Sequence, residues 1–295
     1  MSNELFLITG AAGATGGHAI SELLSKNANV RALVHTQDER AEKLRGKGVE
    51  VIVGDLLDPA AVRRALEGVT GAYFVYPIHH GKLVDATAYF AEAAKAVKVR
   101  SIVNMSQISA RPDAGSYASV SHWYGERVFD WAGTPVTHLR PTFFMEWLMY
   151  GFQLSLIAKH DLLKVPAGQG RHAPIAAEDQ GRAIANILLN PGEHSGKIYP
   201  LYGAVEMNHA ELASEVGKAL GRQITYENES FDAFEARLAQ VGMTPYFIQH
   251  IVNVYRDYSS GVFAGTNDVI QKLTGRAPVT VEEYVKANRQ YFQPD

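Results

Sequence analysis

The chain has 295 residues, 46% hydrophobic and 20% charged, which are the proportions of a globular protein and not of a disordered, collagen-like or coiled-coil chain. The formal net charge of -3 and the lack of lysine- and arginine-rich runs argue against nucleic-acid binding, and the absence of cysteine excludes disulfides and thiolate chemistry. The sequence has no signal peptide pattern and no apolar run of the roughly 20 residues that a membrane span needs, so we expect a cytoplasmic protein with no membrane partner.

Short apolar runs alternate with helical patterns through the first half of the chain. The strands that we predict are 5–9, 30–35, 49–54, 72–76, 101–106 and 136–140. The helices predicted among them are 17–26, 38–45, 60–67 and 83–98. Alternation of this kind is typical of a parallel sheet with helices on both faces. The predicted fold is therefore α/β, with a doubly wound Rossmann sheet.

Helical patterns dominate after Pro141. The helices predicted there are 179–189, 209–220, 231–240, 245–258 and 281–292. Two extended segments, 197–202 and 223–227, either add strands to the main sheet or form a small separate sheet. We predict a Rossmann domain over residues 1–142 and a smaller, mainly helical substrate-binding region over residues 143–295. We leave open whether part of this second region returns to the main sheet.

A glycine-rich loop, TGAAGATGG, joins the first predicted strand to a helix. In such a loop Gly10 permits a tight turn, Gly13 lets the backbone approach a pyrophosphate, and Gly16 lets the helix pack closely on the sheet. The helix N-terminus adds free N–H groups for phosphate oxygens. Glycines also occur in ordinary turns, but here strand, loop and helix agree, so we predict a dinucleotide site. Its predicted contacts in the loop are Gly10, Gly13, Ala14, Thr15 and Gly16.

The ends of the second and third strands bear on the choice of dinucleotide. An NAD-specific site usually ends its second strand with an acid for the ribose 2'-hydroxyl, whereas this strand ends at His35, with Arg40 one turn into the next helix. These side chains suit a 2'-phosphate, although Asp38 reaches the ribose after a small shift. We expect NADP(H), with NAD(H) as the alternative. Asp55 and Leu56 are expected beside the adenine, but capping the next helix is an equal alternative for Asp55.

Several motifs in the same order resemble the NmrA-like family of atypical short-chain dehydrogenases, which includes quinone and dye reductases and redox-sensing regulators. They span essentially the whole chain and are TGAAGATGG, RALVH, GDLLDP, VRSIVNMSQIS, GERVFDWAGTPVTHLRPTFFMEW and TGRAPVTVEEYVKANRQYF. The resemblance implies that the loop glycines hold the pyrophosphate and that the segment after the sixth strand runs beside the nicotinamide. The nicotinamide contacts that it implies are Tyr76, Pro77, Pro141, Thr142 and Phe143.

The catalytic Tyr-x-x-x-Lys of short-chain dehydrogenases is out of register here. On a helix expected to begin near Ser121, the tyrosine falls on Ala118 and the lysine on His122, while Tyr117 is one residue, about 100° of rotation, out of step. His122 either serves the cofactor ribose or donates a proton, since its reference pKa is near neutrality, or it only packs. Ser106 ends the fifth strand where related reductases place a hydroxyl. The candidate catalytic residues are His122, Ser106 and Tyr124.

Aromatic residues gather directly after the sixth strand. Some of them serve core packing, and the cluster equally suits one wall of a substrate pocket. His79 and His80 follow the fourth strand, but adjacent histidines point apart and have no acidic or cysteine partners nearby, so we predict no metal site. The predicted substrate-pocket residues are His79, Phe144, Trp147 and Tyr150.

We therefore predict an NADP(H)-dependent reductase that passes hydride to a conjugated, electron-poor small molecule of the quinone, dye or carbonyl type. The alternative is a redox sensor that binds NADP(H) without turnover and acts through a protein partner, because the usual catalytic pair is missing. A third reading is a conventional carbonyl reductase in which His122, Ser106 or Tyr124 replaces that pair. We expect no nucleic-acid partner, and a homodimer is compatible with the sequence.

Overall fold

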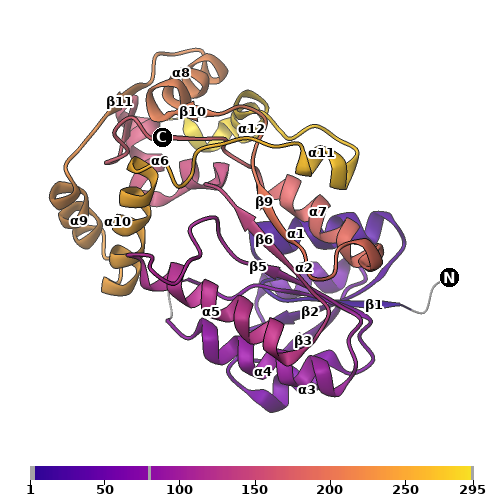
Figure 1. The fold of residues 1–295 in the computed structure, drawn as a ribbon. Coiled ribbons are helices and arrows are strands. Elements are labelled where there is room, and N and C mark those ends of the chain that lie inside the picture. The colour runs from indigo at the N-terminus through magenta and orange to yellow at the C-terminus, as the bar shows by residue number, and fades with distance from the viewer. Residues whose placement is uncertain (1–3, 79–80, 294–295) are drawn as a thin grey trace.

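The main sheet of the protein is parallel, in a computed structural model that describes residues 4–78 and 81–293 (Figure 1). Its strand order is β3-β2-β1-β4-β5-β6-β9, and every neighbouring pair runs parallel. The strands are β1 (Leu5–Ile8), β2 (Asn29–Val34), β3 (Glu50–Val53), β4 (Gly71–Phe74), β5 (Ser101–Met105), β6 (Val136–Pro141) and β9 (Ile198–Leu201). The first six strands follow the Rossmann order, which confirms the predicted doubly wound fold.

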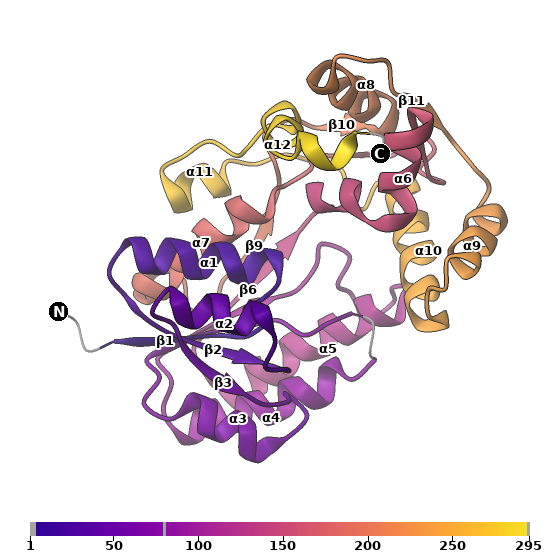
Figure 2. The ribbon, with the colours of Figure 1, turned by 180° about the vertical axis from the view of Figure 1, so that it is seen from behind.

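Helices cover both faces of this sheet (Figure 2). One face carries α1 (Ala14–Ser25), α2 (Glu39–Gly46), α7 (Ala177–Leu189) and α11 (Val269–Thr274). The other face carries α3 (Pro59–Leu66), α4 (Leu83–Ala96) and α5 (Tyr117–Ala132). Because the central strands are covered from both sides, β4 and β5 are buried at every residue.

A separate hydrophobic core lies in the helical region above the sheet in Figure 1. This region contains α6 (Gly151–His160), α8 (His209–Leu220), α9 (Phe231–Gln240), α10 (Pro245–Ser259) and α12 (Val281–Ala287). Short strand pairs accompany the helices: β7 (Leu162–Lys164) with β11 (Thr225–Glu227), and β8 (Arg171–His172) with β10 (Met207–Asn208). Single 3-10 turns are Met145–Met149, Pro191–Glu193 and Arg289–Phe292. In the described ranges, no helix combines the length and the apolar character that crossing a membrane requires.

Both alternatives for the two extended segments occur. Residues 198–201 form β9 at the edge of the main sheet, whereas residues 225–227 form β11 in a small separate sheet. Since α7, β9 and α11 all pack on the main sheet, the helical half of the sequence contributes to both cores. A domain boundary at residue 142 stays a prediction.

The two largest differences from the predicted helix boundaries are at the start of α5 and the end of α12. The helix expected near Ser121 begins at Tyr117, because the hydroxyl of Ser116 accepts a hydrogen bond from the Ser119 N–H at 3.1 Å and caps the helix there. The helix expected over 281–292 ends at Ala287, and a 3-10 turn follows. The short elements α11, β7, β8 and β10 have too few residues to show a period in the sequence.

Candidate functional site

A cleft of about 1020 Å³ lies at the carboxyl ends of the parallel strands. Residues at the ends of all the first six strands line it, and residues from α10 and the segment after β6 complete it. In open α/β sheets, ligands bind at this edge, where the strand order reverses. Here the order reverses between β1 and β4, directly beside the glycine loop.

The glycine loop has the geometry that its sequence predicts. Gly10 has a φ of +57°, and a Cβ there would lie 2.5 Å from Cγ1 of Val75, so only glycine fits the turn. A Cβ on Gly16 would overlap the carbonyl of Gly10. Gly13 precedes α1 without any side-chain cap, and the first turn of α1 carries no acid, which leaves its N–H groups to face an external anion. Gly10, Gly13 and Thr15 line the cleft, whereas Ala14 and Gly16 do not.

At the end of β2, the Asp38 carboxylate is already engaged. One oxygen accepts from the N–H groups of Arg40 and Ala41 at 2.9 and 3.1 Å and caps α2, and the other accepts from the Arg40 guanidinium at 2.9 and 2.6 Å. The hydrogen bond from Arg40 lowers the pKa of Asp38. A carboxylate held in this way orients Arg40 and is a poor acceptor for a ribose hydroxyl. His35, Asp38 and Arg40 all line the cleft.

The helix-cap alternative for Asp55 is wrong. Asp58 caps α3, by accepting from the Ala60 N–H at 2.9 Å, because it directly precedes the proline that begins the helix. Asp55 instead accepts from the Leu57 N–H at 2.8 Å and lies 3.8 Å from Nδ1 of His35. Asp55 and Leu56 line the cleft beside the end of β2.

Three buried polar atoms that line the cleft have no hydrogen-bond partner among the residues that the structure describes. They are the hydroxyls of Ser106 and Thr142 and the side-chain nitrogen of Gln107, at the ends of β5 and β6. A buried polar atom that bonds to nothing costs about 1–3 kcal/mol, so such atoms indicate a missing partner. Together with the uncapped end of α1, they fit a polar ligand such as a dinucleotide.

His122 lines the cleft from α5 and is buried, and its ring makes no hydrogen bond to any residue within 4–78 or 81–293. Burial lowers its pKa to about 4, so the imidazole is neutral at pH 7. Tyr124 is two residues further along the helix, about 200° around it, and is 45% exposed with its ring against Trp123. It does not line the cleft. Tyr117, 62% exposed, also faces away.

Aromatic side chains form the wall of the cleft opposite the glycine loop. Trp147 stacks on Tyr150, with ring centroids 4.6 Å apart and 14° between planes, and it lies nearly parallel to Phe247 at 6.3 Å. The predicted residues that line the cleft in this part are Tyr76, Pro77, Pro141, Thr142, Phe143, Phe144, Trp147 and Tyr150. His79, also predicted for the pocket, lies outside the described residues.

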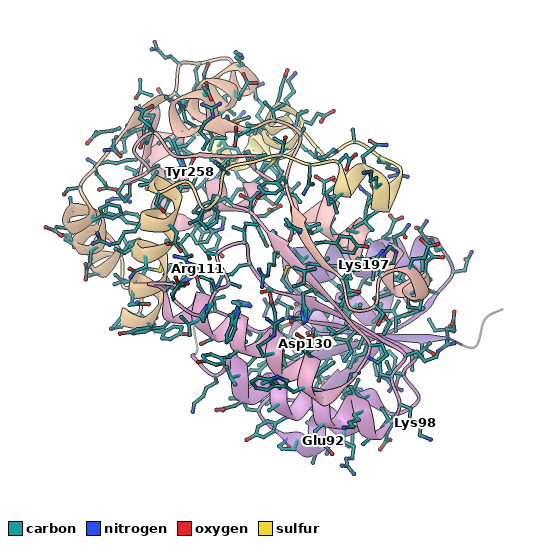
Figure 3. All side chains as sticks on the ribbon, in the orientation of Figure 1. Glu92, Lys98, Arg111, Asp130, Lys197 and Tyr258 are labelled. Carbon is teal, nitrogen blue, oxygen red and sulfur yellow. The ribbon has the colours of Figure 1, made fainter. Side chains whose placement is uncertain are left out.

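One side of the cleft comes from α10 and was not predicted from the sequence. His250 and Val254 line it, and so does Phe263 after the helix. Bidentate hydrogen bonds of 2.8 and 2.6 Å from Arg111 to Asp257 hold α10 against the loop after β5, and Figure 3 labels Arg111 where the two regions meet. The four-residue spacing of His250 and Val254 indicates a shared helix face, but nothing in the sequence says what that face meets.

The described ranges, 4–78 and 81–293, contain no group of three or more histidine, aspartate or glutamate residues placed to hold a metal ion.

Comparisons with known proteins agree over nearly the whole chain. Residues 2–285 match the sequence model of the NmrA-like family. The NAD(P)H azoreductase of Xenophilus azovorans is 28% identical over 290 residues, which cover 98% of this chain and 99% of the relative. The NADPH-dependent quinone oxidoreductase of Escherichia coli, solved with NADPH, is 26% identical, with a TM-score of 0.86 over 96% of this chain and 99% of its own. The triphenylmethane reductase of Citrobacter sp., solved with NADP(H), is 26% identical, with a TM-score of 0.84 over 96% and 99%.

Proposed function

Since this chain belongs to the NmrA-like family, we propose that it is an NADP(H)-dependent reductase that passes hydride to a conjugated, electron-poor acceptor of the quinone or dye type. The observation that carries the proposal is the single cleft of about 1020 Å³ that joins the glycine loop to the aromatic wall. A cofactor and a flat acceptor would lie side by side in it. The azoreductase and the two reductases of known structure support the same activity.

The cofactor would lie along the strand ends. The N–H groups at the start of α1 would bind the pyrophosphate, and Arg40, oriented by Asp38, would bind the 2'-phosphate. Ser106, Gln107 and Thr142 would hydrogen-bond the ribose and carboxamide at the nicotinamide end. NADP(H) is favoured over NAD(H) because Asp38 is occupied by Arg40. When bound, the nicotinamide supplies the hydride.

The protein's own contribution would be alignment and exclusion of water. Trp147 and Tyr150 would hold the acceptor parallel to the nicotinamide, and Phe143 and Phe263 would close the pocket around it. Hydride transfer to an electron-poor ring depends mainly on such positioning. This agrees with the missing Tyr-x-x-x-Lys pair.

The other readings have less support. A conventional carbonyl reductase needs a proton donor, but His122 is neutral at pH 7 and Tyr124 faces away from the cleft. A redox sensor without turnover would not need the aromatic pocket beside the nicotinamide end. We therefore do not propose either of them.

A titration of NADPH fluorescence, followed by NADPH absorbance with a quinone, an azo dye and a triphenylmethane dye, tests the proposal. We expect binding of NADPH and oxidation that depends on the acceptor. Binding with no oxidation by any acceptor would favour the sensor, and no binding of NADPH or NADH would overturn the assignment of the cleft.

Trp147→Ala should raise KM for the acceptor at least about tenfold and leave the Kd for NADPH within about twofold, because it removes only the stacking surface.

A further inference from the structure

His250 lies on the acceptor side of the cleft. It belongs to α10, is only 3% exposed, and lines the cleft together with Val254. Its ring is 6.4 Å from that of Phe247, which lies parallel to Trp147 of the aromatic wall. It is therefore a buried polar ring beside the aromatic side chains that would hold an acceptor.

The partner of His250 fixes which ring nitrogen carries the proton. Oγ of Ser116 lies 2.7 Å from Nδ1 of His250, and it accepts from the Ser119 N–H at 3.1 Å as the cap of α5. Ser116 is fully buried, and Nδ1 is the only acceptor that its hydroxyl reaches among the described residues. The hydroxyl therefore donates to Nδ1, and the proton of the neutral imidazole is on Nε2.

We propose that His250 donates a hydrogen bond from Nε2–H to an oxygen of a quinone acceptor and stabilises the negative charge that hydride transfer leaves there. Ser116 is the positioning residue that holds the ring in the required tautomer. The inference rests on the proposed function and names a quinone-directed group within it.

The reaction balances without a proton from His250. A quinone that receives hydride gains two electrons and one hydrogen, and NADPH is oxidised to NADP⁺. The negative charge that remains on a quinone oxygen is removed by a proton from water. His250 only donates a hydrogen bond to that oxygen, as neutral histidines do at other carbonyl-polarising sites.

His122, the histidine that the sequence favours, lacks such an orienting partner. It lines the cleft from α5, but no residue within 4–78 or 81–293 hydrogen-bonds its ring. No hydrogen bond within the described residues therefore determines its tautomer. The two histidines differ in this respect, and the difference favours His250 as the group that recognises the acceptor.

A comparison of two acceptors, a quinone and a triphenylmethane dye, distinguishes this role of His250 from general damage to the site. A quinone develops charge on oxygen when it is reduced, whereas a triphenylmethane cation takes hydride at its central carbon, becomes neutral, and places no charge on oxygen. His250→Phe keeps an aromatic ring but removes the donor. We expect it to lower kcat for the quinone about a hundredfold and to lower the quinone-to-dye ratio of kcat/KM at least about tenfold.

Matched variants sharpen the test. His250→Gln keeps an N–H near the position of Nε2 and should recover part of the ratio. Ser116→Ala should lower the ratio, whereas Ser116→Thr, which keeps the hydroxyl and the helix cap, should restore it. His160→Gln, on the exposed end of α6, should change neither acceptor.

The tautomer is measurable without turnover. In protein labelled with ¹⁵N-histidine, the signals of His250 are those that disappear in His250→Phe, and we expect them to report a neutral ring protonated at Nε2. A ring protonated at Nδ1 would overturn the inference, and so would equal losses for both acceptors or no loss for either. A wild-type protein that reduces neither acceptor would overturn the proposed function and this inference with it, whereas reduction by the wild type with an unchanged ratio in His250→Phe would overturn the inference alone.

Discussion

Individual atoms at the end of β2 account for the cofactor preference that we propose. The guanidinium of Arg40 donates to the Asp38 carboxylate through Nε and Nη2. Both residues lie in the short segment after the strand. The sequence alone left Asp38 as evidence for NAD. The structure shows that both oxygens of the Asp38 carboxylate already accept hydrogen bonds. Asp38 therefore orients Arg40 for a 2'-phosphate, and the same residue supports NADP(H).

Removal of the Arg40 guanidinium should therefore change the cofactor preference. Arg40→Ala should raise the Kd for NADPH about 10- to 100-fold, the value of a charge-assisted hydrogen bond to phosphate, with the Kd for NADH within about twofold. Fluorescence titration measures both constants. Arg45→Ala is the control, since Arg45 lies on the same helix, pairs with Glu42 and does not line the cleft. Equal weakening of NADPH and NADH in Arg40→Ala would contradict this assignment.

Gly10, in the glycine loop, and Gly17, in the helix that follows, should respond differently to substitution by alanine. Gly10→Ala combines a φ of +57° with a Cβ 2.5 Å from Val75, whereas a Cβ on Gly17 meets nothing closer than 3.9 Å. We expect Gly10→Ala to lose about 1–3 kcal/mol of unfolding free energy and most of the NADPH affinity. Gly17→Ala should be neutral or slightly stabilising in the helix. Urea unfolding of both variants checks this, and equal stabilities would count against the tight turn.

At the scale of elements, local patterns were sufficient for the sheet and insufficient for α10. Each parallel strand is recognisable in the sequence as a short run of mainly apolar residues. The loop after each strand lies at the carboxyl edge of the sheet, where the cofactor binds, so the cofactor side of the cleft was predictable. His250 and Val254 line the same cleft although they lie more than 100 residues after the end of β6. Their position depends on tertiary packing, which the local spacing of residues does not predict. The hydrogen bond between Ser116 and His250 could not be predicted from the sequence for the same reason.

The position of α10 should depend on one ion pair. Asp257→Asn removes the charge from its bidentate contact with Arg111, and we expect a loss of about 1–3 kcal/mol of unfolding free energy and faster hydrogen exchange in α10. Asp113→Asn is a matched control, because Asp113 also lies 3.4 Å from Arg111 but is 83% exposed, so its loss should cost at most about 0.5 kcal/mol. Unchanged exchange in α10 after Asp257→Asn would show that other contacts hold the helix.

At the scale of the whole molecule, buried ionisable groups set limits on stability at both ends of the pH range. Burial lowers the pKa of His122 to about 4 and that of His209 to about 3, so both favour folding above pH 6.5, and this contribution is lost as the pH falls below 6.5. Burial raises the pKa of Glu146 from 4.5 to about 7 and that of Asp179 from 3.8 to about 6, so each carboxyl lowers the stability as the pH rises from the first of these values to the second. Stability should be greatest near pH 6.

Glu146→Gln should remove part of the alkaline loss. Because the folded protein no longer has to ionise a buried carboxyl, the variant should gain about 1–3 kcal/mol over the wild type at pH 8 and almost nothing at pH 5. The amide oxygen can still accept from the Ala177 N–H, which donates to Glu146 at 3.0 Å. Glu235→Gln, on the exposed face of α9, is the control for urea unfolding at both pH values. A gain that is the same at pH 5 and pH 8 would exclude this linkage.

The return of the chain from the helical region to the sheet means that this protein cannot be divided by a single cut. A fragment ending at residue 142 would leave β6 as an open edge, because β9 would be missing, and it would strip α7 from the face of α1. That face is shaped for close approach, since a Cβ on Gly181 of α7 would lie 2.8 Å from the backbone nitrogen of Ala19. Gene truncation near residue 142 would thus expose an aggregation-prone surface and would not give a free nucleotide-binding module.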